Sequence, residues 1–133
     1  MATWSEMREH LVQTYGLEED LDRGAGRLKG FMPNGYGSDR LVLVHDTGNE
    51  STGDLMSVES PVADLDHLDL ARALTSMGSM VTGGLVVGTY APGWVSVRQT
   101  VTLANVYTDD VRTAMERVPS IARQLAIECA GEE

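Results

Sequence analysis

Residues 40–60 read RLVLVHDTGNESTGDLMSVES, and this stretch decides the fold class. Its first part, Arg40 to His45, carries four consecutive apolar residues, which is typical of a central strand or one covered on both faces. Its last part, Leu55 to Ser60, alternates between two sets of side chains with the period of a strand. The connection from Asp46 to Gly53 is rich in turn-forming residues. Short strands joined in this way predict an antiparallel meander.

Three further stretches on either side of this segment have strand character. Arg27 to Met32 predicts a short strand before it, linked by the turn-rich residues 33–38. Leu85 to Ala91 and Trp94 to Leu103 flank Pro92-Gly93, which is a hairpin signal. The sequence therefore predicts three strands in one run and two in another.

A helix with clear end signals opens the chain. Thr3 and Glu6 have the spacing of a capping box, and Gly16 supplies a stop. Apolar residues recur between them at helical spacing. The face that they form consists of Trp4, Met7, Leu11, Val12 and Tyr15.

Two more helices are predicted. Asp64 or Asp66 can cap the second, which should fray near Gly78 because the residues there are poor helix formers. Its inward stripe consists of Leu68, Ala71, Leu74 and Thr75.

The third helix follows an N-cap at Asn105 or Thr108 and runs to about Ala130, with a bend expected at Pro119. Its apolar stripe steps by four and three residues. The stripe consists of Val111, Met115, Val118, Ala122, Leu125 and Cys129.

The predicted order is helix, three strands, helix, two strands, helix. Strands grouped in runs indicate an α+β fold with an antiparallel sheet and flanking helices, α-β-β-β-α-β-β-α. The length of 133 residues and the absence of a linker favour one domain over residues 1–133.

Composition excludes several classes of partner. Acidic residues outnumber basic ones twenty to ten, for a net charge of −10, which disfavours nucleic acid and anionic membrane surfaces. The N-terminal residues contain no signal-peptide pattern, and no apolar stretch reaches the ~20 residues of a membrane span, so a cytoplasmic protein is expected. Cys129 is the only cysteine, which rules out an intramolecular disulfide and a thiolate-rich metal site.

Three patterns resemble catalytic or ligand motifs. Asp46-Thr47-Gly48 follows an apolar strand, as in aspartic proteases, but His45 and Asn49 do not fit that motif and the helical content does not fit an all-β protease. Gly24 to Gly30 resembles a phosphate loop, but no helix follows it. The histidines, His10, His45 and His67, have no metal-ligand spacing. We therefore expect no catalytic residue, no metal site and no cofactor.

Three local patterns and the order of elements resemble the type III secretion chaperone-like fold, including the YbjN-like family. The patterns are an arginine leading the central strand in Asp39 to Val44, a Ser-Pro strand end in Val58 to Val62, and the hairpin end Val101 to Leu103 before an acidic-capped helix. The resemblance implies a small acidic bacterial homodimer without enzymatic activity that holds a segment of a client or secreted substrate. Lys29 is the only lysine, and this arginine bias indicates a GC-rich genome, which favours a general chaperone-like adaptor over a dedicated secretion chaperone.

The predicted function is therefore non-enzymatic binding of a partner protein, and the alternative is a regulatory or small-ligand-sensing domain. A sensing domain should show a pocket of several hundred Å³ lined by convergent polar groups. The predicted partner-binding residues are Met32, Tyr36, Leu41, Leu43, Met56 and Val58. The predicted homodimer residues are Leu68, Leu70, Val86 and Tyr90.

Overall fold

The computed structural model of the chain describes residues 3–20, 26–33, 38–47, 55–79, 83–102 and 109–132. These residues form a six-stranded sheet and three α-helices, so the predicted α+β class is confirmed. The elements are α1 (Trp4–Tyr15), β1 (Glu18–Glu19), β2 (Arg27–Met32), β3 (Arg40–Asp46), β4 (Leu55–Asp64), a short 3₁₀ helix (Leu65–His67), α2 (Leu70–Met77), β5 (Gly84–Val87), β6 (Trp94–Thr102) and α3 (Asp109–Ala130).

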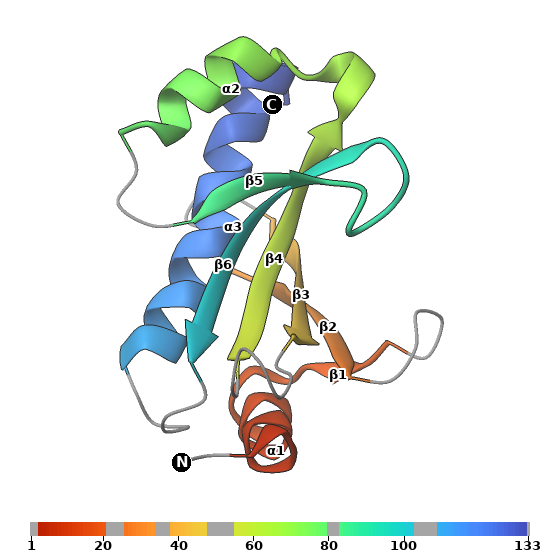
Figure 1. The fold of residues 1–133 in the computed structure, drawn as a ribbon, viewed down its shortest axis with the longest axis vertical. Coiled ribbons are helices and arrows are strands. Elements are labelled where there is room, and N and C mark those ends of the chain that lie inside the picture. The colour runs from red at the N-terminus through yellow and green to blue at the C-terminus, as the bar shows by residue number, and fades with distance from the viewer. Residues whose placement is uncertain are drawn as a thin grey trace.

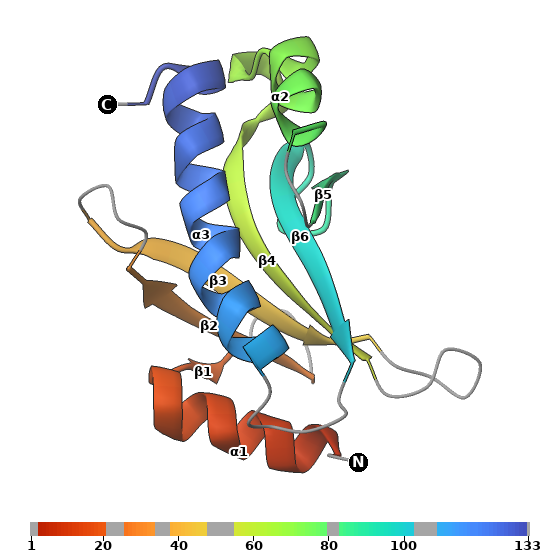
Figure 2. The same cartoon turned by 90° about the vertical axis from the view of Figure 1, so that its left-hand side faces the viewer.

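The sheet has the order β1-β2-β3-β4-β6-β5, and every neighbouring pair is antiparallel. α3 runs along one face of the sheet, and α1 and α2 lie near its two ends (Figures 1 and 2). Val42, Val58 and Val97 face α3 and are fully buried in one core with Met115 and Leu125. The opposite face of the sheet carries no helix in the described part of the chain.

The first helix follows its sequence signals. The hydroxyl of Thr3 accepts a hydrogen bond from the Glu6 N–H, and the Glu6 carboxylate accepts one from the Thr3 N–H. Gly16, in the left-handed conformation, donates its N–H to the Val12 carbonyl and ends the helix. The predicted capping box and stop are both confirmed.

The second helix starts later than predicted. Asp69 is its N-cap, and the side chain of Asp64 caps the preceding 3₁₀ helix instead. The Asp69 N–H donates to the carbonyl of Cys129 at 2.7 Å, which ties the start of α2 to the end of α3. α3 is one helix with Pro119 inside it, as predicted, while its predicted caps Asn105 and Thr108 lie outside the described residues.

The strands differ from the prediction most clearly in three places. β1 was not expected, because two glutamates carry no apolar alternation. β5 ends at Val87 rather than Ala91. β4 continues past Ser60 to Asp64, although Pro61 lacks an N–H for a ladder bond.

Two hydrogen bonds from one arginine side chain explain how β4 passes through a proline. The β3–β4 ladder ends at the Leu43–Glu59 pair, so the next residues of β4 have no ladder partner on that side. There Arg40 donates from Nε to the Pro61 carbonyl at 3.1 Å and from Nη2 to the Val62 carbonyl at 2.9 Å. The Arg40 side chain thus replaces missing backbone partners.

Candidate functional site

The candidate site lies on the sheet face opposite α3, which we call the open face. Because side chains alternate along a strand, Val42 and Val44 point toward α3 while Leu41, Leu43 and His45 point to the open face. Residues paired in register share a face, so Glu59 lies beside Leu43.

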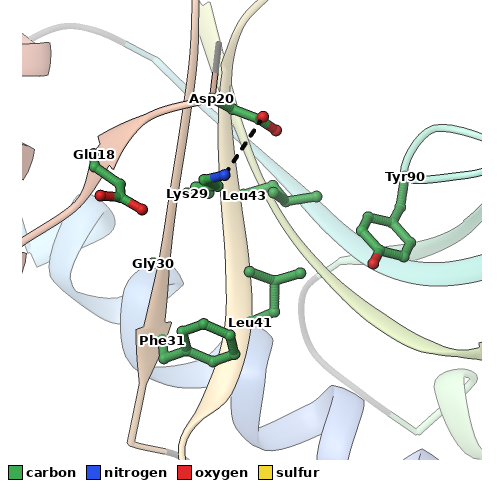
Figure 3. A pocket seen from close by; sticks show the side chains of 8 residues that line it. All are labelled: Glu18, Asp20, Lys29, Gly30, Phe31, Leu41, Leu43 and Tyr90. Atoms are coloured by element: carbon green, nitrogen blue, oxygen red, sulfur yellow. Dashed lines mark ion pairs between the residues drawn. The ribbon is translucent and has the colours of Figure 1, made fainter. Parts of the chain in front are cut away.

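A pocket with a volume of about 350 Å³ opens on this face. We call it the open-face groove. Figure 3 shows its side chains arising from β1, β2, β3 and the turn between β5 and β6. Its lining residues are Glu18, Asp20, Lys29, Gly30, Phe31, Leu41, Leu43 and Tyr90.

Charged side chains form one end of the groove. Asp20 is buried, and its carboxylate lies 3.4 Å from the Arg27 Nε and 3.9 Å from the Lys29 Nζ. Glu18 is paired in register with Lys29 and is exposed. This end therefore presents both signs of charge, with acidic groups at the short edge strand β1.

Apolar and aromatic side chains form the other end. Phe31 is 67% exposed, which is unusual for a large aromatic side chain. Leu41 lies next to it, and Tyr90 reaches toward Leu41 and Leu43 from the β5–β6 turn (Figure 3). An edge-to-face contact with Trp94, with ring centroids 5.5 Å apart, holds the Tyr90 ring.

Beside the groove, the open face buries a carboxylate. Glu59 is fully buried, and its Oε1 lies 3.3 Å from the His45 Nε2. Burial is the largest single influence on the pKa of Glu59 and raises it, but the nearby polar groups of His45 and Ser96 and the charge of Arg27 outweigh it. The pKa of Glu59 is therefore lowered, and the carboxylate is ionised at neutral pH.

The predicted partner-binding residues divide between the two faces. Leu41 and Leu43 line the open-face groove. Met32, Met56 and Val58 belong to the core under the helices, because they occupy the other alternation of their strands, and the candidate surface is corrected to exclude them. Tyr36 lies outside the described residues.

The predicted dimer residues also separate. Leu68 is buried in the core, so it is removed from the predicted dimer interface. Leu70 is 36% exposed and Val86 is half-buried. Tyr90 lines the groove rather than the surface near α2.

Sequence reasoning missed the groove residues Glu18, Asp20, Lys29 and Phe31. The sequence did contain a signal for Phe31. Strand alternation places Phe31 on the face of β2 opposite to the core residues Leu28 and Met32. Glu18 and Asp20 had no such signal, because only pairing of β1 with β2 brings them to the groove.

Asp46 and Thr47 do not form a catalytic arrangement with His45. Asp46 follows His45 in β3 and is exposed on the other side of the strand, and Gly48 lies outside the described residues. Among the residues that the structure describes, no three His, Cys, Asp or Glu side chains converge as metal ligands. Nor does any described helix have the length and apolar character needed to cross a membrane.

Comparison of the chain with protein-family models, curated proteins and solved structures finds no match.

Proposed function

We propose that this protein is a non-enzymatic, chaperone-like adaptor that binds a segment of a partner protein in the open-face groove. The carrying observation is the 67% exposure of Phe31 beside Leu41 and Tyr90 in a pocket of about 350 Å³. Exposed apolar surface gathered in a concavity is typical of a binding surface.

The lining chemistry describes the partner. An apolar or aromatic side chain fits against Phe31, Leu41 and Tyr90, which exclude water from it. Next to it, the exposed carboxylate of Glu18 favours a basic residue, and the net charge of −10 adds a general attraction for basic segments. The partner segment is thus an apolar anchor with a basic neighbour.

The non-enzymatic part of the proposal is supported by the position of the titratable groups. Glu59 and His45 form the closest acid–histidine pair near the groove, yet neither lines it. Glu59 is fully buried, so a substrate has no access to its carboxylate. A cytoplasmic location accords with a net charge of −10 and forms part of the proposal.

Site-specific photocrosslinking in the native host tests the partner. A photoreactive phenylalanine replaces Phe31 in a tagged protein, and crosslinked products are identified by mass spectrometry. The expected result is one protein crosslinked near stoichiometrically from position 31. The Phe31→Ala and Tyr90→Ala variants should each lose its co-purification, while circular dichroism shows that they remain folded.

Ile127 provides the matched control, because it is 37% exposed and lies on α3, which covers the other face of the sheet. The same photoreactive residue at position 127 should not yield that product. The proposal is abandoned if positions 31 and 127 give the same products, or if Phe31→Ala retains the partner.

The groove also gives a specific reason for the alternative, a small-ligand-sensing domain. A volume of about 350 Å³ with Glu18, Asp20 and Lys29 converging at one end suits a small amphipathic molecule. Native mass spectrometry of protein purified from its host separates the two functions. A retained small molecule with a defined mass favours sensing, and its absence together with a crosslinked protein favours the adaptor.

We also propose a homodimer that uses α2 and the outer edge of β5. Leu74 and Val87 are 55% and 54% exposed, and Leu70 is 36% exposed on the same helix as Leu74. β5 is the last strand of the sheet, so one of its edges has no neighbour in the described part of the chain. Exposed apolar residues next to an open strand edge favour pairing with a second copy.

A further inference from the structure

A second cavity lies where the start of β3 meets the end of α3. Its volume is about 270 Å³. It shares Leu41 and Tyr90 with the open-face groove but differs in its other walls. Those walls are Asp39, Arg40, Pro61, Val62, Trp94, Arg123 and Glu132.

Two buried guanidinium groups converge in this cavity on one carboxylate oxygen. The Nη1 of Arg40 lies 2.8 Å from the Glu132 Oε2, and the Nη1 of Arg123 lies 3.3 Å from the same atom. Arg40 is 9% exposed and Arg123 is 8% exposed. Two desolvated cations therefore share a single anion. Buried positive charges need a counter-charge, which a carboxylate between them supplies.

Both arginines are held by groups other than Glu132. Arg40 donates to the carbonyls of Pro61 and Val62, and the Nη2 of Arg123 donates to the Ser38 carbonyl at 3.0 Å. The Arg123 Nε is buried and has no hydrogen-bond partner among the described residues. The guanidinium pair is thus preorganised, with donor capacity that Glu132 does not use.

Glu132 is the least anchored member of the group. It lies beyond the end of α3 at Ala130 and is 37% exposed at its side chain. Its backbone makes one hydrogen bond, from its N–H to the Ala126 carbonyl at 3.0 Å. A carboxylate on a ligand can take its place while both arginines keep their other contacts.

The remaining walls define the rest of that ligand. Leu41, Tyr90 and Trp94 offer an apolar and aromatic surface beside the guanidinium pair. Asp39 also lines the cavity, and its negative charge disfavours ligands that carry more than one negative charge. A planar carboxylate matches the paired donors of arginine better than a bulkier anion.

We propose that Arg40 and Arg123 form a binding site for an organic monocarboxylate with an adjacent apolar or aromatic group, and that Glu132 occupies this site as an internal competitor. The carboxylate comes either from a small free acid or from the C-terminus of a peptide. The two arginines that define this site lie outside the open-face groove, so the site goes beyond the adaptor function.

Titration of the isotope-labelled protein, followed by NMR and calorimetry, tests the site with three probes. N-acetylphenylalanine represents a peptide C-terminus, its uncharged amide is the matched control, and phenylacetate represents a free acid. In the Glu132→Ala variant the two acids should bind about tenfold more tightly than in the wild type, because the competing carboxylate is gone. The amide should not bind, and the Arg123 Nε–H signal should shift with the acids alone.

Two variants made together with Glu132→Ala locate the binding. Arg123→Gln should abolish acid binding, whereas Arg117→Gln, an exposed arginine on the same helix, should leave it unchanged. If Arg123→Gln does not fold, the acid–amide comparison and the shift of the Arg123 Nε–H signal still decide whether the acids bind at this site. Tighter binding of phenylacetate than of N-acetylphenylalanine would assign a free acid, and the reverse order would assign a peptide C-terminus. Equal binding of acid and amide, or an unmoved Arg123 signal, overturns the proposal.

Discussion

Glu59 shows how a single buried charge is maintained in a small sheet. It lies on the open face, where no described helix covers it, yet it is fully buried by its neighbours on the sheet. The His45 imidazole lies 3.3 Å away, and the charge of Arg27 also favours the ionised carboxylate. An ionised carboxylate without such partners would be strongly destabilising in this position.

Replacing this carboxylate should change both stability and its pH dependence. Because the pKa of Glu59 is lowered on folding, its stabilisation is fully present above the ordinary value of 4.5 and is lost as pH falls through the folded pKa. Glu59→Gln should lower the free energy of unfolding by about 1–3 kcal/mol at pH 7. The difference from the wild type should shrink below pH 4.5. Urea denaturation across this pH range measures it, with the exposed Glu128→Gln as control, and a difference independent of pH would contradict it.

At the scale of the element, sequence predicted what is determined locally. The capping box of α1, the stop at Gly16 and the apolar stripe of α3 depend on residues a few positions apart, and all three are present. The predicted end of β4 at Ser60 was wrong, because a proline such as Pro61 normally terminates strand pairing. Its carbonyl partner is Arg40, which is distant in sequence, so no local pattern could reveal the longer strand.

Gly30 lies in β2 where the segment after α1 packs against this strand, and there is little room for a side chain at this position. A Cβ on Gly30 would lie 2.4 Å from the Leu17 Cδ2, and Leu17 is buried with 2% exposure. Gly30→Ala should therefore destabilise the protein by about 1–3 kcal/mol, since the buried Leu17 side chain must shift to make room for the new methyl group. Thermal and urea unfolding measure the change. Gly84→Ala is the control in β5, where a Cβ meets no atom within 4 Å, and equal effects of the two substitutions would refute the packing argument.

At the scale of the whole molecule, the groove is a product of the sheet rather than of one segment. It combines residues from Glu18 to Tyr90, brought together by the β1–β2 pairing and by the β5–β6 turn that reaches over β3. Sequence predicted Leu41 and Leu43 because they lie in the clearest strand. It did not predict Lys29, Phe31 or the position of Tyr90, because strand order and sheet twist are set by long-range packing.

The proposed homodimer is also tested on the whole molecule. Leu74 on α2 lies at the opposite end of the molecule from α1, on which Val12 is 36% exposed (Figure 1). Leu74→Glu places a charge in the proposed interface, where desolvating it without a partner opposes association. Light scattering should give the wild type a mass of twice 14.4 kDa and the Leu74→Glu variant the mass of one chain. Val12→Glu adds the same charge outside the interface and should remain dimeric.

The melting temperature should rise with protein concentration for the wild type and Val12→Glu, because unfolding of a dimer is coupled to its dissociation. The melting temperature of Leu74→Glu should not depend on protein concentration. A monomeric wild type would exclude the dimer, and a dimeric Leu74→Glu variant would place its interface elsewhere.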